Sequence, residues 1–289
     1  MQIAPNVHAL RIPFVVPVAP GVALERFVYA YVLLGERTWL IDTGVKGSDS
    51  SILQFVAELG RNPESIERIL LTHSHIDHIG GAPALVAQTG AKTQGHAAER
   101  RWFEDVELQA RERPVPGFFQ LVDTSVKLDD ELEDELRLEL APQFHLRVIH
   151  APGHSPGGCA FLHEEEGVLF TGDAVPVVGD MPVYDDPLLS AASIAKLREL
   201  PDVETIASAW DEPRSGDEVA HVLDAGAALL EAIHSAVREE PPPSSDIERQ
   251  AFCSAILGRV GLAPAMANPM VLRTFLSHLA YSDRPTLGG

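Results

Sequence analysis

The stretch LTHSHIDHIGG, residues 71–81, constrains the fold of this chain most, because an apolar run leads straight into three histidines and an aspartate. The preceding residues IERILLT (66–72) have the length and apolar content of a short buried strand. The following residues GAPALVAQTG have helical spacing and end at Gly90. A strand, a polar loop and a helix in succession indicate an α/β layered architecture, in which loops at strand ends commonly carry catalytic residues.

Four side chains of this loop are of the types that bind metal ions: His73, His75, Asp77 and His78. Alternate residues of an extended chain turn to the same side, so His73 and His75 can point at one ion. Asp77 and His78 follow the turn toward the helix and can face a second ion. Imidazole nitrogen and carboxylate oxygen suit zinc, iron or manganese. A chance surface cluster is the alternative, and the position directly after an apolar strand argues against it.

Two later stretches supply further ligand candidates, which a catalytic metal needs because it usually has three protein ligands and an open position. In HAPGHSPGG, glycines and a proline predict a tight turn that presents His154 from the end of another strand. In VLFTGDAV, Asp173 follows an apolar strand and Gly172, where its carboxylate could lie between two cations. Either residue alone would be an ordinary loop residue. Together with the loop after residue 72, they predict a metal centre.

The order of these motifs resembles that of the metallo-β-lactamase fold superfamily of metal-dependent hydrolases, over about residues 20–215. The motifs are IDTG (41–44), THSHIDH (72–78), PGHSPGG (152–158) and TGDA (171–174). The resemblance implies an α/β fold of the αββα four-layer sandwich type, with the metal centre at one edge of two packed β-sheets. It is specific for the superfamily and only weakly specific for any one activity.

Ligand roles follow from the same resemblance, position by position. It implies a first metal held by His73, His75 and His154, a second held by Asp77 and His78, and Asp173 as a bridge between them. It also implies that Asp42 supports a ligand histidine without touching the metal. A simple turn-forming role at a strand end is the alternative for Asp42.

One position departs from the superfamily pattern. Many members carry a Gly-His-Gly-type turn after a final strand, and its histidine completes the second site. Here VETIASAWDEPRSG (203–216) contains no histidine, and the simplest alignment places Asp211 at that position. An aspartate ligand would make the second site more anionic and more favourable to manganese or iron. A surface-turn role, beside a single metal or a weak second site, is the alternative for Asp211.

Composition limits the partners of the chain. Its 42 acidic and 22 basic residues give a formal net charge of −20, which would repel a phosphate backbone and argues against nucleic acid. No apolar run reaches the ~18 residues of a membrane span, and the N-terminal stretch MQIAPNVHALRIPF lacks signal-peptide features, so we expect a cytoplasmic protein outside membranes. Cys159 and Cys253 form no pair motif and are expected to be buried apolar residues.

The predicted organisation has two parts. Residues 1–216 are expected to form the catalytic domain, and residues 217–289 a C-terminal helical region that could cap the active-site mouth or form a homodimer face. Residues 97–126 are interpreted as an insertion into the first part. Its aromatic residues could wall a pocket or pack the insertion onto the domain; they are Trp102, Phe103, Phe118 and Phe119.

The predicted activity is hydrolysis of a small ester, lactone, thioester or related substrate. Two divalent ions, zinc first and manganese or iron as alternatives, lower the pKa of bound water toward ~7. Asp77 is the candidate catalytic residue, since it could orient the hydroxide and pass its proton to the leaving group. A mononuclear iron oxygenase resembling persulfide dioxygenases, and a non-catalytic metal-binding member of the superfamily, are the alternatives.

Subfamily features after the bridging aspartate are absent. The stretch DAVPVVGDMPVYDD lacks the TLF-like or Gly-Arg-containing stretch of glyoxalase II-like thioesterases and persulfide dioxygenases. It also lacks the tyrosine that lactonases with similar metal motifs carry shortly after that aspartate. Tyr184 comes later; it could approach the site, and a packing role is the favoured interpretation. Seven histidines outside the motifs are interpreted as structural or surface residues: His96, His145, His150, His163, His221, His234 and His278.

Overall fold

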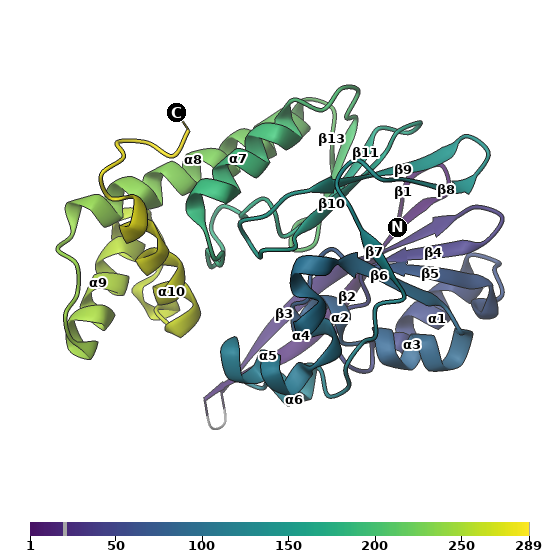
Figure 1. The fold of residues 1–289 in the computed structure, drawn as a ribbon, viewed down its shortest axis with the longest axis horizontal. Helices are drawn as coiled ribbons and strands as arrows, with labels where there is room; N and C mark the ends of the chain where they lie inside the picture. Colours follow the sequence, from purple (N-terminus) through teal and green to yellow (C-terminus); the bar gives the residue numbers. More distant parts are fainter. Residues whose placement is uncertain (20–21, 289) are drawn as a thin grey trace.

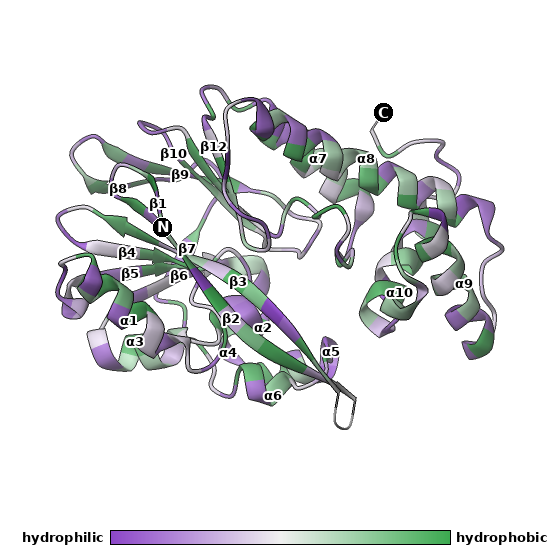
Figure 2. Ribbon diagram, turned by 180° about the vertical axis from the view of Figure 1, so that it is seen from behind, coloured by the Kyte–Doolittle hydropathy of each residue, from purple (hydrophilic) through white to green (hydrophobic). Residues whose placement is uncertain are grey.

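The computed structural model describes residues 1–19 and 22–288, which form two β-sheets packed face to face with helices on both outer faces (Figure 1). This is the αββα arrangement that the sequence predicts. Hydrophobic residues follow the strands of both sheets, while hydrophilic residues gather in the connecting loops (Figure 2). The central strands β4 (Thr38–Ile41), β10 (Cys159–His163) and β11 (Val168–Gly172) consist of buried residues, as a sheet within a layered fold requires.

The first sheet has the strand order β1-β2-β3-β4-β5-β6-β7. Its antiparallel part consists of β1 (Gln2–Ala4), β2 (Val7–Ala19), β3 (Val22–Leu34) and β4 (Thr38–Ile41). Its parallel part continues from β4 through β5 (Ile66–Leu70), β6 (Lys92–His96) and β7 (Asp130–Leu132). The carboxyl ends of the parallel strands meet at one edge of the sheet, where β5 leads into the histidine loop.

The second sheet has the order β13-β12-β11-β10-β9-β8. Its strands are β8 (Arg137–Ala141), β9 (Phe144–His150), β10 (Cys159–His163), β11 (Val168–Gly172), β12 (Thr205–Ser208) and β13 (Arg214–Ser215). Only the β11–β12 pair is parallel among these neighbours. Loops after β9 and β11 carry the other two motif residues, so both sheets present ligand candidates at the same edge.

Three apolar clusters correspond to the three spaces between the four layers. One lies between the sheets and joins residues such as Tyr31 and Phe170. The second lies between the first sheet and the helices α1 (Ser48–Glu58) and α3 (Ala82–Thr89). The third lies between the second sheet and the helices α7 (Pro187–Arg198), α8 (Asp217–Glu239), α9 (Asp246–Arg259) and α10 (Pro269–Ser277).

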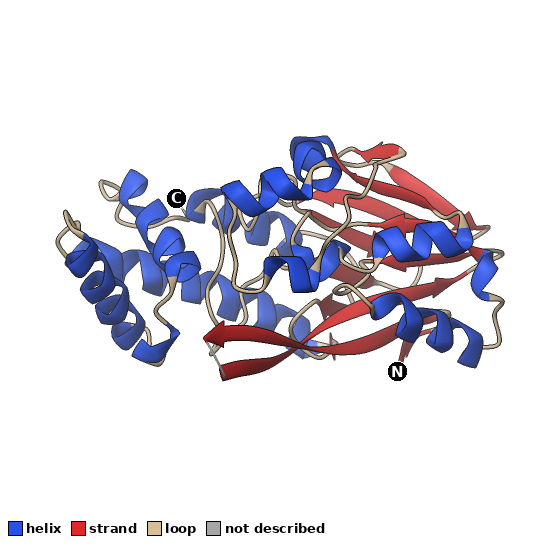
Figure 3. Cartoon of the chain, turned by 90° about the horizontal axis from the view of Figure 1, so that it is seen from below, coloured by secondary structure: helices blue, strands red, loops and turns tan. Residues whose placement is uncertain are grey.

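The helices α9 and α10 lie at one end of the molecule, and most of the two sheets lies at the other (Figure 3). Ser245 caps α9 by accepting the backbone N–H of Glu248 at 3.3 Å, so the N-cap lies just outside the helix and Asp246 is its first residue. The long helix α8 packs against α7 and so joins the C-terminal helices to the second sheet. The division at residue 216 into two domains stays a prediction.

The segment 97–126 folds into three short helices, α4 (Arg100–Glu104), α5 (Val106–Glu112) and α6 (Phe118–Leu121). The side chains of Phe103 and Phe118 join the apolar cluster under the first sheet, which matches the packing interpretation. Trp102 is buried and its indole N–H donates to Glu112 at 2.8 Å, whereas Phe119 is exposed. None of the helices in the described part of the chain is long and apolar enough to cross a bilayer.

Candidate metal centre

The chain turns sharply after β5, and this turn brings the loop histidines together. Extended residues lead up to His75, which is the N-cap of the one-turn helix α2 (Ile76–Ile79). His73 therefore projects from the loop, while Asp77 and His78 project from the helix. The ring centroids of His73 and His78 are 4.0 Å apart, and those of His73 and His75 are 4.4 Å apart. The convergence of His73 and His75 and the turn toward the helix, both expected from the sequence, are present.

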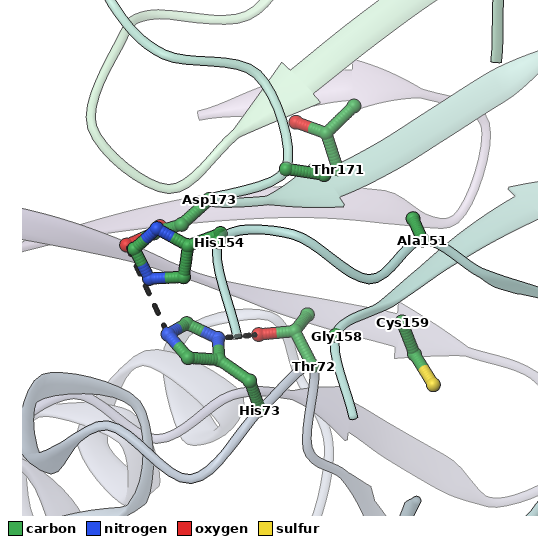
Figure 4. A pocket seen from close by; sticks show the side chains of 9 residues that line it. Thr72, His73, Ala151, His154, Gly158, Cys159, Thr171 and Asp173 are labelled. Atoms are coloured by element: carbon green, nitrogen blue, oxygen red, sulfur yellow. Dashed lines mark hydrogen bonds and ion pairs between the residues drawn. The ribbon is translucent and has the colours of Figure 1, made fainter. Parts of the chain in front are cut away.

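Glycines allow the two other motif residues to reach this loop. Gly153 has φ +133°, and a Cβ there would lie 2.3 Å from the backbone nitrogen of Ser190, so only glycine fits before His154. Gly172 has φ +50° and lies against the side chain of Thr72, which draws Asp173 toward the histidine loop. His154 and Asp173 thus approach His73 from the second sheet (Figure 4).

The first group of ligand candidates consists of His73, His75, His154 and Asp173. Nδ1 of His75 lies 2.9 Å from Nε2 of His73 and 2.8 Å from Nε2 of His154. Oδ2 of Asp173 lies 3.4 Å from Nε2 of His154 and 3.9 Å from Nε2 of His73. Three imidazole nitrogens and one carboxylate oxygen thus converge on a single point, the donor set of a catalytic zinc or iron site.

The second group consists of Asp77, His78 and Asp173. Nε2 of His78 lies 3.5 Å from Oδ2 of Asp77 and 3.4 Å from Oδ1 of Asp173. Asp173 belongs to both groups and offers one oxygen to each. The structure therefore brings together six of the residues that the sequence predicts as ligands, with Asp173 between the two groups.

Hydrogen bonds made by Nδ1 of three histidines fix which ring nitrogen is left to bind a metal ion. Nδ1 of His78 donates to Oδ2 of Asp42 at 2.7 Å, and Nδ1 of His154 donates to the carbonyl of Val183 at 2.7 Å. The hydroxyl of Thr72 donates to Asp42 at 2.7 Å and so can accept from Nδ1 of His73 at 3.0 Å. Each of these histidines then presents Nε2, the atom that points inward, to a metal ion.

Asp42 occupies a backbone conformation with φ 58°, which is uncommon for a residue other than glycine. Its carboxylate is 2% exposed and accepts three hydrogen bonds, from the backbone nitrogen and hydroxyl of Thr72 and from His78. These bonds hold the local strain in place. The position of Asp42 agrees with the supporting role that the resemblance implies.

Unpartnered polar atoms test whether the site fits metal ions. Among the described residues, buried atoms with no hydrogen-bond partner include Oδ2 of Asp77, Nε2 of His78 and Oδ1 of Asp173. These are the three atoms that face one another in the second group. Buried polar atoms without a partner cost about 1–3 kcal/mol each, and a divalent cation among them would satisfy all three. The donor atoms of the second group therefore fit a divalent ion.

The electrostatics of the histidines also favour metal binding. Burial, together with the neighbouring histidines and Arg113, holds the pKa of His73 and of His75 well below the usual value, so both imidazoles are neutral and able to bind metal. Burial would also lower the pKa of His78, but the carboxylates of Asp173, Asp42 and Asp77 outweigh it and raise that pKa well above the usual value. A cation at Nε2 of His78 would replace this proton.

Glu99 is a residue of the site that the sequence analysis missed. Its carboxylate is fully buried, and Oε2 accepts the backbone N–H of Ser74 at 2.6 Å while Oε1 accepts that of Gly157 at 2.8 Å. Glu99 thus joins the loop of His73 and His75 to the turn of His154. The stretch AAER around it has no motif character, so no signal in the sequence identifies it.

Asp211 lies outside both groups of ligand candidates. Its carboxylate pairs with Arg214 at 3.2 Å and accepts the backbone N–H of Glu212 at 2.8 Å. The preceding residue, Trp210, contacts the site instead, because its indole N–H donates to Oδ2 of Asp173 at 3.1 Å. The structure thus gives Asp211 a local partner at the position where the sequence predicts a metal ligand.

Tyr184 and two of the histidines interpreted as structural have buried hydrogen-bond partners. The hydroxyl of Tyr184 donates to Nε2 of His278 at 2.7 Å, and His234 lies 3.2 Å from His278, so these three form a buried polar chain under the C-terminal helices. His163 is buried against Phe144. Both cysteines are free and buried, as the sequence predicts.

Comparison with protein families gives one match over most of this fold. The family described as the metallo-beta-lactamase superfamily matches residues 23–210. These residues run from the start of β3 to just beyond β12 and include all six convergent ligand candidates. The match ends before α8, the first of the C-terminal helices.

Two curated bacterial relatives are about 30% identical to the chain. The probable metallo-hydrolase YqgX of Bacillus subtilis is 31% identical over 148 residues, which are 50% of this chain and 65% of that protein. The hydroxyacylglutathione hydrolase GloC of Haemophilus influenzae is 31% identical over 169 residues, which are 56% of this chain and 74% of that protein. The chain therefore spans about two thirds to three quarters of these relatives.

Solved structures share the fold over a longer range. A metallo-beta-lactamase family protein from Thermus thermophilus superposes with a TM-score of 0.75 at 24% identity, covering 97% of this chain and 94% of that one. The likeness thus extends over the C-terminal helices. The protein TTHA1623, solved in a di-iron-bound form, has a TM-score of 0.53 at 28% identity and covers 65% of this chain and 89% of its own.

Proposed function

The chain belongs to the metallo-beta-lactamase superfamily of metallo-hydrolases, and on that premise we propose that it hydrolyses a small ester, lactone, thioester or related substrate with two divalent ions. The observation that carries the proposal is the pair of ligand groups that share Asp173. A thioester is the first substrate class to test, because one relative is named a hydroxyacylglutathione hydrolase. Which ester or thioester is cleaved depends on the residues around the metal centre.

Six residues would hold the ions: His73, His75, His154 and Asp173 the first, and Asp77, His78 and Asp173 the second. When bound, such a pair lowers the pKa of water toward ~7 and polarises the scissile carbonyl. Zinc is the proposed metal, since histidine nitrogens dominate the first group. Manganese and iron are the alternatives, and the di-iron form of TTHA1623 makes iron a metal to assay.

The residues of this chain would act through position and proton transfer. Asp42, Thr72 and Val183 orient the imidazoles through the outer hydrogen bonds described above. Trp210 holds Asp173 through its indole N–H. Asp77 is half-buried at the edge of the second group, where its carboxylate could orient the attacking water and pass its proton to the leaving group.

Metal analysis and a substrate panel test the proposal. The purified protein, loaded with zinc, manganese or iron, is assayed on generic esters, lactones, thioesters and phosphodiesters. We expect turnover of at least one ester-type substrate with two ions per chain. His75→Ala should remove the activity, because it deletes the nitrogen on which His73 and His154 converge. His221→Ala, an exposed position on α8, is the matched control and should change nothing.

Other outcomes would select another function. One iron per chain with oxygen consumption and no hydrolysis would favour the mononuclear iron oxygenase. Metal binding without turnover of any substrate would favour a non-catalytic metal-binding protein. Activity that survives His75→Ala unchanged would not belong to this site and would contradict the proposal. The cytoplasmic location, the exclusion of nucleic acid and a homodimer formed through the C-terminal helices stay predictions.

A further inference from the structure

Two arginines lie beside the metal centre and share a single carboxylate. Arg113 ends α5 and is 6% exposed, while Arg273 lies on α10 with 39% of its side chain exposed. Nη2 of Arg113 lies 2.7 Å from Oδ2 of Asp185, and Nη2 of Arg273 lies 3.6 Å from Oδ1 of the same residue. Two positive charges therefore face one negative charge, in a chain whose formal net charge is −20.

Arg113 is attached to the loop of the first metal site. One turn earlier on α5, the side chain of Gln109 donates to the carbonyl of Ser74 at 2.6 Å, between His73 and His75. The guanidinium of Arg113 lies 4.6 Å from the ring centroid of Trp102, a cation–π contact that helps to hold it in place. The insertion thus places a rigid positive charge next to the ligand histidines.

Arg273 reaches the same place from the C-terminal helices. Its neighbour Thr274 pairs with both backbone groups of Tyr184, accepting from its nitrogen at 3.0 Å and donating to its carbonyl at 2.9 Å. In the same segment, Val183 accepts from His154, and the backbone nitrogen of Asp185 donates to Gly153 at 2.8 Å. The segment 183–185 therefore lies between the first metal site and α10.

The hydrogen-bonding capacity of these arginines is not filled. Nε, Nη1 and Nη2 of Arg113 and Nε of Arg273 are buried without a hydrogen-bond partner among the described residues. The short contact of Arg113 with Asp185 is thus an ion pair without a directed hydrogen bond. Burial lowers the pKa of Arg273; Asp185 opposes this effect, and the charge of Arg113 adds to it. Because a buried charge without a full partner is costly, a second anion would stabilise this arrangement.

The geometry favours a carboxylate as that anion. Asp185 already places one oxygen toward each guanidinium, which shows that the two arginines are spaced for the two oxygens of one carboxyl group. Arg273 has the longer contact and the exposed side chain, so it can accept a second carboxylate. A planar guanidinium pairs with a planar carboxylate through two parallel hydrogen bonds.

We propose that Arg273, positioned by Arg113 and Asp185, binds a carboxylate of the substrate, so that the substrate is a carboxylate-bearing ester or thioester. The proposal rests on the proposed hydrolytic function and names its substrate class. Arg273 is the residue that touches the substrate. Arg113 and Asp185 are positioning residues that hold Arg273 and supply the local charge.

A matched pair of thioesters tests the proposal on the zinc-loaded protein. The acetyl thioester of 3-mercaptopropionate carries a carboxylate, and that of its methyl ester does not. We expect kcat/KM to be at least about 10-fold higher for the anionic thioester, as for a hydrogen bond between charged groups. Arg273→Gln should remove this preference, mainly by raising the KM of the anionic thioester. Arg249→Gln, an exposed arginine on α9, should behave as wild type.

Calorimetry separates the subsite from the catalytic activity. Glutarate and glutaramide are titrated into the zinc-loaded wild type and into Arg273→Gln. We expect glutarate alone to bind the wild type, and to bind the variant at least about 10-fold more weakly. If neither thioester is cleaved but glutarate still binds through Arg273, the carboxylate-binding site at Arg273 is supported and the proposed thioester hydrolysis is contradicted.

Three results would contradict the proposal that Arg273 binds a substrate carboxylate. The first is equal kcat/KM for the two thioesters in the wild type. The second is glutarate binding that survives Arg273→Gln, which would place the carboxylate on the metal ions. The third is inorganic phosphate binding more tightly than glutarate and being lost in the same variant, which would make the ligand a phosphate instead.

Discussion

Oδ2 of Asp42 accepts a hydrogen bond from Nδ1 of His78 at 2.7 Å, and this contact decides which face of the imidazole is free for a metal ion. The two residues are 36 positions apart: Asp42 directly follows β4, and His78 lies on α2, beyond the adjacent parallel strand β5. Because Asp42 also accepts two hydrogen bonds from Thr72, one buried carboxylate orders both the backbone before the loop and the histidine after it.

Asp42→Asn should weaken the second metal site. An amide presents a donor where the carboxylate now accepts, so it cannot satisfy Thr72 and His78 together. Loss of such an outer partner typically costs about 10–100-fold in metal affinity, and we expect that loss for the second ion. Chelator competition followed by metal analysis measures it. Asp49→Asn, a half-buried aspartate of α1 whose carboxylate accepts from Gln88, is the control, and equal affinities in both variants would contradict the prediction.

Glu99→Gln should loosen the connection between the two ligand loops. The substitution keeps the shape of the side chain but turns an amide donor toward the backbone N–H of Ser74 or of Gly157. We expect the free energy of unfolding of the metal-free protein to fall by about 1–3 kcal/mol, and the first ion to bind more weakly. Urea unfolding and chelator competition measure the two effects.

The control for Glu99 is Glu25→Gln, an exposed glutamate on β3. It changes the net charge by the same amount without touching either loop. If both variants lose the same stability, or if Glu99→Gln leaves the first ion as tightly bound as in the wild type, the joining role of Glu99 is wrong.

His278 should make the protein less stable in acid. Burial, with the nearby His234, lowers its pKa from 6.5 to about 3. Below pH 6.5 the unfolded chain takes up a proton that the folded protein does not, so stability falls as the pH drops from 6.5 toward about 3. At pH 5 this amounts to about 2 kcal/mol, since each unit of pKa corresponds to about 1.4 kcal/mol.

His278→Gln isolates this contribution, because glutamine can still accept from Tyr184 and donate to His234. The free energy of unfolding is measured at pH 7 and at pH 5 for the variant and the wild type. We expect the wild type to lose about 2 kcal/mol more than the variant between the two pH values. Parallel losses would show that His278 does not titrate as its burial predicts.

Asp211→Ala tests the ligand role that the sequence predicts at the end of β12. Since Arg214 pairs with this carboxylate at 3.2 Å, we expect the variant to keep both ions with unchanged affinity. Metal analysis after dialysis gives the stoichiometry, and Glu212→Ala serves as the neighbouring control. Loss of the second ion in Asp211→Ala alone would instead support Asp211 as a ligand that leaves Arg214 when metal binds.

Much of the site could be predicted because its chemistry is local. The alternation that aims His73 and His75 at one point, and the turn that presents His78, depend on residues adjacent in the chain. The glycines before His154 and Asp173 likewise mark tight turns at the ends of strands. The αββα fold followed from the same motifs through the resemblance, and the structural likeness agrees with it.

What the sequence could not determine depends on contacts between distant segments. Glu99, Arg113 and Arg273 lie in stretches without motif character, and an isolated glutamate or arginine is ordinarily a surface residue. Their roles come from packing, which buries Glu99 against two loops and brings α5 and α10 to the same carboxylate. Likewise, Asp211 matches a ligand position in the alignment. In the structure, the turn places Arg214 beside it, and its carboxylate pairs with that arginine.

The sequence by itself therefore determined the types and order of the ligand candidates and the strands that lead to them. Only the tertiary structure decided which buried charges acquire partners and which keep unfilled hydrogen bonds. The physical reason is that side-chain direction follows from local backbone geometry, whereas the cost of burying a charge depends on every segment that packs around it.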